Sequence, residues 1–282
     1  MKTLFSQLHY LFSGPRILIV SLPKAGTHLV SKIMDLTPGI RAAQVHLGHA
    51  TFAHWAERNP QQPPHIPIGL DWPVYAPPVA VRRALQRIRR GSYGTIHAPY
   101  SLPLAELCAS REIKAIAIIR DPRDVVVSHA RYIVQTPPHF LHNFYQTLST
   151  DEQLMTSITG LHNGHGFPQL QSIAERFAGI LEWRAQDFVC FCSFEKLVGE
   201  RGGGSEVEQR VEITKVLQHL ELDSSPQTAR AIAQNLFGGT QTFRKGQIGS
   251  WKQHFTPAHK AAFKRLMDPI PIETGYVQDS DW

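Results

Sequence analysis

The sequence predicts an α/β protein, a single domain built on a doubly wound parallel sheet flanked by helices. Four short segments rich in apolar and β-branched residues predict strands buried on both faces, at 16–21, 93–97, 114–120 and 188–193. Segments with helical spacing of apolar residues alternate with them, at 27–34, 123–134, 168–184, 205–220, 226–236 and 257–267. Such alternation is typical of parallel sheets, and a chain of 282 residues is long enough for one such domain.

The first predicted strand, at 16–21, runs into a loop that predicts a binding site for a phosphate or sulfate group. Pro23 ends the strand, and Gly26 lets the backbone approach an anion closely before a helix begins near Thr27. Lys24 supplies a cation and Thr27 a hydroxyl donor. A Walker A loop has its lysine after the glycine, so an ordinary NTPase is disfavoured. A plain strand-turn-helix with a surface lysine is the alternative.

Two stretches resist assignment, residues 44–80 and 136–167, and we expect both to be long irregular loops. Prolines crowd the first stretch, at 60, 63, 64, 67, 73, 77 and 78. Long loops on a rigid scaffold often carry function. Arginines interleaved with apolar residues then predict a solvated amphipathic helix at 82–90.

The strand predicted at 114–120 ends in Arg120, a second candidate anion ligand. Ligands bind at the carboxyl ends of the strands in open parallel sheets, so central strands would bring Arg120 and Lys24 to the same edge. Ser128 follows two helical turns later, and its hydroxyl can face the same cleft. Alternatively, Arg120 pairs with Asp121 or Asp124 in a structural ion pair.

A basic, glycine-punctuated segment at 243–252 predicts a second anion-binding loop. Arg244 offers a planar fork for phosphate oxygens. No regular strand is predicted there, so the backbone amides of Lys245 and Gly246 are available to an anion. A solvated basic turn is the alternative.

Composition narrows the function class only in part. The formal net charge of +6 suits a polyanionic ligand, and it suits nucleic acid or a membrane surface equally well. No run of residues approaches the length of a membrane span. Histidines cluster at 46, 49 and 54 and at 162 and 165, but neither group has a convincing ligand set, so no metal is expected.

Taken in order, the three candidate anion-binding segments closely resemble the sulfotransferases that use 3'-phosphoadenosine 5'-phosphosulfate (PAPS), especially the cytosolic type. The stretch 22–27 is similar to the family's loop for the 5'-phosphosulfate of the donor. The spacing from Arg120 to Ser128 is similar to that of its 3'-phosphate ligands, and 244–252 resembles its C-terminal motif. The resemblance implies the P-loop-like sulfotransferase fold, with PAPS as the donor cosubstrate.

The resemblance also implies which residues bind the donor. They are Lys24, Ala25, Gly26, Thr27, His28, Leu29, Arg120, Ser128, Phe194, Phe237, Arg244, Lys245 and Gly246. Leu29 stands where the family usually has an aromatic residue near the adenine, and Phe194 stands where it often has a tyrosine. His28 replaces a second hydroxyl residue.

The implied catalytic residues are His97 and Lys24. His97 lies in a short element between a strand and Pro99, the place of the family's catalytic histidine, and would take the proton of the acceptor hydroxyl as a general base. Lys24 would stabilise charge on the leaving phosphate. The family commonly has a lysine at the position of Thr95, so one positive charge is missing, and Lys24 or a cation from another loop must compensate.

The implied reaction is transfer of a sulfuryl group to a hydroxyl acceptor by in-line displacement. The acceptor is expected to be a small molecule or a lipid or glycan hydroxyl, bound under the irregular loops, with no nucleic acid partner and a cytoplasmic location. Both a monomer and a homodimer stay open. Two alternatives also remain: a kinase-like, nucleotide-dependent phosphotransferase, and a non-catalytic member of the fold that binds a nucleotide or polyanion.

Overall fold

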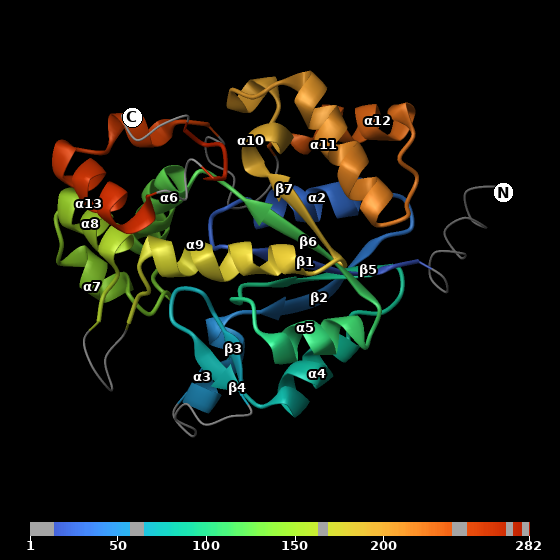
Figure 1. Cartoon of the computed structure of the whole chain (residues 1–282), viewed down its shortest axis with the longest axis horizontal. Coiled ribbons are helices and arrows are strands. Elements are labelled where there is room, and N and C mark those ends of the chain that lie inside the picture. The colour runs from blue at the N-terminus through green and yellow to red at the C-terminus, as the bar shows by residue number, and fades with distance from the viewer. Residues whose placement is uncertain (1–13, 57–64, 163–168, 239–246, 269–272, 278–281) are drawn as a thin grey trace. The chain divides into compact units, whose positions relative to one another are not determined.

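The computed structural model describes residues 14–56, 65–162, 169–238, 247–268, 273–277 and 282 (Figure 1). The chain divides into two compact units. The first comprises residues up to 119 together with 179–248, and the second comprises 120–178 together with 249–282. That the two units make one domain stays a prediction.

The first unit is built on a parallel sheet, which confirms the predicted fold class. Its strand order is β2-β5-β1-β6-β7, with bounds Arg41–Leu47, Ser92–Ile96, Arg16–Ser21, Ile113–Ile119 and Val189–Ser193. Each neighbouring pair is parallel, and β1 lies between β5 and β6. The last five residues of β1 and of β6 are buried, as expected of strands covered on both faces.

The edge strand β2 is the one strand of this sheet that the sequence did not predict. Arg41, Gln44 and His46 are exposed, so the strand lacks a continuous apolar run. Its pairing with β5 shifts register between Ala42 and His46, and Gln44 has a positive φ of 53°. This irregularity is typical of a bulge at a sheet edge. It interrupts the alternation of buried and exposed side chains, so the sequence of β2 does not show the two-residue period of a strand.

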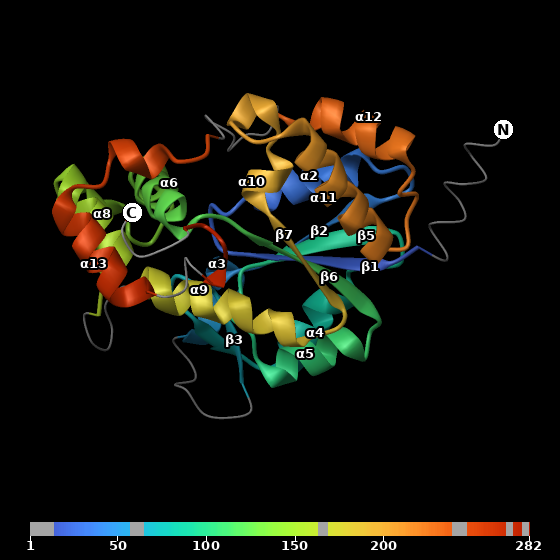
Figure 2. The same cartoon turned by 45° about the horizontal axis from the view of Figure 1, so that its top comes forward.

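Helices cover both faces of the sheet in the first unit (Figures 1 and 2). One face carries α2, α11 and α12, and the other carries α4 and α5. The bounds are α2 Thr27–Leu36, α4 Pro78–Gln86, α5 Leu102–Ala109, α10 Phe194–Leu197, α11 Glu206–His219 and α12 Pro226–Leu236, with short 3-10 turns η1 Glu182–Ala185 and η2 Glu200–Gly202. Helices on both faces are the doubly wound arrangement that the sequence predicted.

The expectation of an irregular loop at 44–80 was wrong for much of that stretch. It contains the end of β2, a helix α3 (His49–Ala56) and an antiparallel hairpin of β3 (Ile66–Ile68) and β4 (Val74–Ala76). The strands are three residues long, too short for a recognisable period. Pro67 lies within β3, a position that a strand of a two-stranded hairpin tolerates because one side of the strand makes no ladder bonds.

The second unit is helical. It contains α6 Pro122–Gln135, α7 His142–Gln146, α8 Thr150–Thr159, the start of α9 Ile173–Leu181, η3 Ser250–Gln253 and α13 Pro257–Met267. α6 packs against α7, α8 and η3, and α13 packs against α8. The prediction that 136–167 is irregular was therefore also wrong where α7 and α8 lie. A capping box of Ser149 and Glu152 starts α8, and the serine followed three residues later by glutamate is a pattern that the sequence alone contains.

Gly26 ends the loop after β1 in a conformation that few other residues can adopt, with φ at 116°. A Cβ there would lie 2.8 Å from Ile118 Cδ1 and 3.0 Å from Phe194 Cδ2. Gly203 also has a positive φ, 89°, but a Cβ there would meet nothing within 4 Å.

We therefore expect Gly26→Ala to lower the free energy of unfolding by about 1–3 kcal/mol more than Gly203→Ala, because only the first substitution adds overpacking to backbone strain. Urea unfolding of the two variants measures the difference. Equal losses would show that the close approach at Gly26 has no energetic weight.

Candidate active site

The loop after β1 lies where the sheet topology places ligand sites. β1 pairs with β5 on one side and β6 on the other, so the chain leaves β1 at the point where the strand order reverses. Lys24 has a positive φ of 71°, and Gly26 is the N-cap residue of α2 in the left-handed conformation. The amide of Ala25 donates to the Leu22 carbonyl over 3.1 Å and closes the turn. Both Lys24 and His28 reach solvent at this turn.

His97 follows β5 and is tied to the end of β1 by its side chain. Its Nδ1 lies 2.7 Å from the carbonyl oxygen of Ser21 and 3.3 Å from Ser21 Oγ. A carbonyl oxygen can only accept, so Nδ1 carries the hydrogen and Nε2 keeps its lone pair. Ser21 Oγ also lies 2.6 Å from Thr27 Oγ1, which joins the histidine to the start of α2. The ring is thus fixed in the tautomer that a general base needs at Nε2.

The backbone of His97 is held from two further segments. Its amide donates to the Leu47 carbonyl over 2.8 Å, and its carbonyl accepts from the Gly69 amide over 2.7 Å. Burial lowers the pKa of His97 below 6.5, and the positive charges of His28 and Lys24 lower it further. The hydrogen bond to Ser21 and the charge of Asp71 oppose this shift only in part. His97 is therefore neutral near pH 7.

A second histidine, His46 on β2, lies against His97. The ring centroids are 4.9 Å apart at an interplanar angle of 74°, an edge-to-face arrangement. His46 Nδ1 lies 2.8 Å from the hydroxyl of Thr95, the residue two positions before His97. His46 as a whole residue is exposed at the sheet edge, but its ring lies against His97, and the resulting desolvation lowers its pKa to about 4, with smaller contributions from the charges of His97 and His28.

Among the residues implied for the adenine, Phe194 lies beside the first loop. Its ring approaches Gly26, and it is buried in the same apolar cluster as Leu29. Phe237 packs at the border of this cluster, with the guanidinium of Arg201 4.6 Å from its ring centroid. All five residues named here belong to the first unit.

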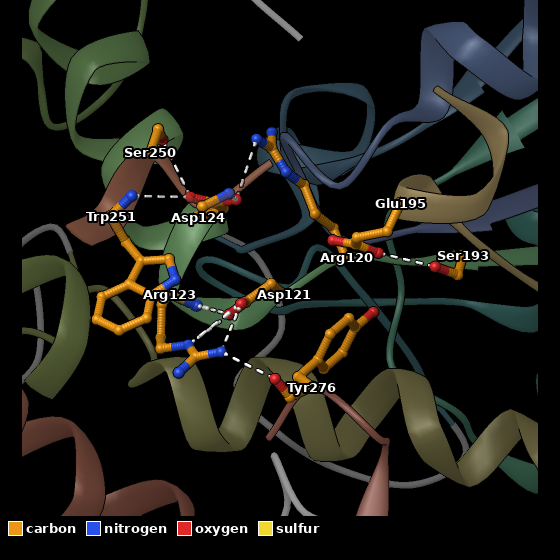
Figure 3. A network of polar contacts seen from close by, with 10 residues as sticks. Arg120, Asp121, Arg123, Asp124, Ser193, Glu195, Ser250, Trp251 and Tyr276 are labelled. Atoms are coloured by element: carbon orange, nitrogen blue, oxygen red, sulfur yellow. Dashed lines mark hydrogen bonds and ion pairs between the residues drawn. The ribbon is translucent and has the colours of Figure 1, made fainter. Parts of the chain in front are cut away.

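In the second unit, the start of α6 is a network of buried ionic contacts (Figure 3). The carboxylate of Asp121 caps the helix by accepting from the Arg123 amide over 2.9 Å, and it also accepts from Arg123 Nε and Nη2. The guanidinium of Arg123 lies over the rings of both Trp251 and Trp282, 4.2 Å and 4.4 Å from their centroids. Asp121 therefore pairs with Arg123.

Arg120 follows β6 directly, is 8% exposed, and pairs with Asp124 instead (Figure 3). Nη2 of Arg120 lies 3.7 Å from Asp124 Oδ2. This is one of the two ion pairs that the sequence left open for Arg120.

Asp124 is fully buried and organises the described end of the C-terminal motif. Its carboxylate accepts from the Gly249 amide over 2.8 Å, from Ser250 Oγ over 3.0 Å and from the Trp251 amide over 2.9 Å. One helical turn further along α6 lies Ser128, which is half-buried. Asp124 thus ties residues 249–251 to α6, the helix that carries Ser128, one of the predicted 3'-phosphate ligands.

The structure brings some of the predicted site residues together and leaves others outside its description. Lys24, Thr27 and His97 lie together at one edge of the sheet in the first unit. In the second unit, Ser128 lies on α6 and Arg120 lies two residues before that helix begins. The predicted anion ligands Arg244, Lys245 and Gly246 lie outside the described residues.

Sequence reasoning missed the roles of Ser21 and His46, and it considered Asp124 only as a partner for Arg120. No local motif marks any of these three contacts. Ser21 is the last residue of β1, so its place at a strand end beside a glycine loop was the one available signal.

We expect Asp124→Ala to lower the free energy of unfolding by about 3–5 kcal/mol, because Arg120 and three hydrogen-bond donors would lose a buried acceptor. Amide hydrogen exchange at residues 249–251 should accelerate. Asp151→Ala, at an exposed position of α8, is the control and should cost no more than about 1 kcal/mol. A loss as small for Asp124→Ala as for Asp151→Ala would contradict the anchoring role.

Comparison with protein families gives one match: the family model described as "Sulfotransferase domain" matches residues 14–275. A comparison with curated proteins finds no match. Among the described residues, no helix is both long and apolar enough to span a membrane.

Solved structures of low sequence identity share the fold. Mouse sulfotransferase SULT7A1 complexed with PAP aligns with a TM-score of 0.59 and 18% identity over 97% of this chain and 91% of that one. Retinol dehydratase in a complex with retinol and PAP aligns with a TM-score of 0.50 and 14% identity, over 95% and 86% of the two chains. The same enzyme with androsterone and inactive cofactor PAP gives a TM-score of 0.51 and 13% identity, over 99% and 86%.

Proposed function

The chain belongs to the sulfotransferase domain family, and we propose that it transfers a sulfuryl group from PAPS to a hydroxyl acceptor, with His97 as the general base. The observation that carries the proposal is the hydrogen bond from His97 Nδ1 to the Ser21 carbonyl, which leaves Nε2 as a proton acceptor at the end of the anion-binding loop. The PAP bound by structural neighbours supports PAPS as the donor.

Donor binding is proposed to use both anion-binding regions. The loop of Lys24 to Thr27 takes the 5'-phosphosulfate, with His28 beside it. The remaining residues hold the other end of the donor: Arg120, Ser128, Arg244, Lys245 and Gly246 for the 3'-phosphate, and Leu29, Phe194 and Phe237 for the adenine. Binding energy at the 3'-phosphate then fixes the sulfur in place for attack.

In the proposed reaction, the acceptor oxygen bonds to sulfur as the bond from sulfur to the 5'-phosphate oxygen breaks. His97 Nε2 takes the hydroxyl proton while its Nδ1 stays bound to Ser21. Negative charge grows on the phosphate oxygen that leaves. Lys24 and the loop amides stabilise that charge, as preorganised donors do in phosphoryl transfer.

The acceptor is proposed to be a small-molecule alcohol, with lipid and glycan hydroxyls as wider members of the same class. Retinol and androsterone both carry a hydroxyl group, and both are bound in the retinol dehydratase structures. The segment 47–72, which bonds the backbone of His97 near both of its ends, contains apolar side chains. Among them are the buried Phe52 and Trp72, which stacks on His49. Such surroundings suit an apolar alcohol.

The test is transfer of radiolabelled sulfate from PAPS to a panel of alcohols, phenols and sugars, together with calorimetric titration of PAP. His97→Ala should lower kcat by about 10²–10⁴-fold, because the base is lost while the donor contacts remain. PAP affinity should change by less than about twofold.

His219→Ala is the matched control, since His219 is a half-buried histidine at the end of α11 that bonds the Phe188 carbonyl. It should leave both quantities unchanged. A His97→Ala variant that loses PAP affinity as fully as turnover would speak against the assignment. A magnesium-dependent phosphoryl transfer from ATP would favour the kinase-like alternative.

The pH dependence of kcat/KM follows from the lowered pKa of His97. The base works when neutral, and its pKa in the folded protein lies below 6.5, so kcat/KM should be flat near pH 7 and fall only in acid below pH 6.5. Initial rates measured across this range report the midpoint. A midpoint above 6.5 would contradict the burial argument.

A further inference from the structure

The position of the His46 ring depends on one hydrogen bond and on the absence of a side chain at residue 48. His46 faces Thr95 across the β2–β5 pairing, and its Nδ1 is 2.8 Å from the Thr95 hydroxyl. The ring also occupies the space beside Gly48, where a Cβ would come within 2.6 Å of His46 Nε2. Any side chain at residue 48 would therefore push the imidazole away from its present position.

The ring that is held in this way abuts His97. Their centroids lie 4.9 Å apart, edge to face. The Ser21 contacts hold His97 through Nδ1 alone, so they do not by themselves prevent the ring from tilting about that bond. The His46 ring supplies a second contact, on a different part of the His97 imidazole.

We propose that His46 is a positioning residue for His97: bonded to Thr95 and seated in the space that the lack of a side chain at Gly48 leaves open, it holds the His97 ring in the orientation in which Nδ1 donates to Ser21 and Nε2 is left to accept a proton. The catalytic use of Nε2 rests on the proposed function, whereas the positioning itself does not.

Charge makes His46 suitable for this task. Lys24 is the positive group that acts on His97, Asp71 is the negative group, and His28 adds positive charge only when it is protonated. A cation at His46 would add to the repulsion when His97 takes a proton. With its pKa lowered to about 4, His46 stays neutral near pH 7 and contacts the imidazolium without opposing it.

The experiment compares His46→Ala, Gly48→Ala and Thr95→Val by two readouts. The first is kcat, KM for the acceptor and PAP affinity. The second is the ¹⁵N chemical shifts of the His97 ring, which report the fraction of the Nδ1–H tautomer with or without any activity.

His46→Ala should lower kcat by about tenfold or more, with PAP affinity within about twofold of the wild type, and should move the His97 shifts toward a mixture of tautomers. Gly48→Ala should do the same while keeping the imidazole, because it displaces the ring. Thr95→Val should have a smaller effect in the same direction. Gly203→Ala and His219→Ala are the matched controls and should leave both readouts unchanged.

Unchanged His97 shifts and a kcat within about twofold in both His46→Ala and Gly48→Ala would overturn the proposal. If His46→Ala fails to fold, Gly48→Ala and Thr95→Val carry the same decision. If the wild type neither transfers a sulfuryl group nor binds PAP, the proposed function fails, and the His97 shifts alone decide whether His46 positions the ring.

Discussion

The hydrogen bond between His97 Nδ1 and the Ser21 carbonyl is the contact on which the candidate site depends. It joins the carboxyl ends of two neighbouring parallel strands, β1 and β5, and it can form only because their register places those ends side by side. It also selects the tautomer, since a carbonyl oxygen cannot donate. A sheet built to bury apolar side chains thus determines which ring nitrogen is free for chemistry.

In the second unit a buried carboxylate has the equivalent organising role. Asp124 gathers two backbone amides and a hydroxyl from residues 249–251, and it lies next to Arg120. Burying a charge is costly unless donors surround it, and here the donors come from a segment far away in the chain. The carboxylate thereby fixes the segment that leads out of the basic motif against the helix carrying Ser128.

The sequence was enough to predict the four strands that read as apolar runs and the helices with strong apolar periodicity. It was also enough for the turn and helix that follow the first strand, because Pro23 and Gly26 act on the backbone locally, whereas anion binding by this loop stays a prediction. It could not predict β2, whose exposed polar residues and register shift hide its period, and so it could not place His46 beside Thr95, 49 residues later in the chain. The Asp124 contact to Gly249, over 125 residues, is likewise a property of tertiary packing alone.

The contact of Arg123 with both Trp251 and Trp282 has an optical consequence. The two indoles lie 5.3 Å apart at an interplanar angle of 87°, close enough for their electronic transitions to couple. Trp183, in the first unit, is fully buried in different surroundings, where its Nε1 donates to the Ala98 carbonyl. The circular dichroism of this indole pair should therefore report the packing of the side chains around Arg123 in the helical unit.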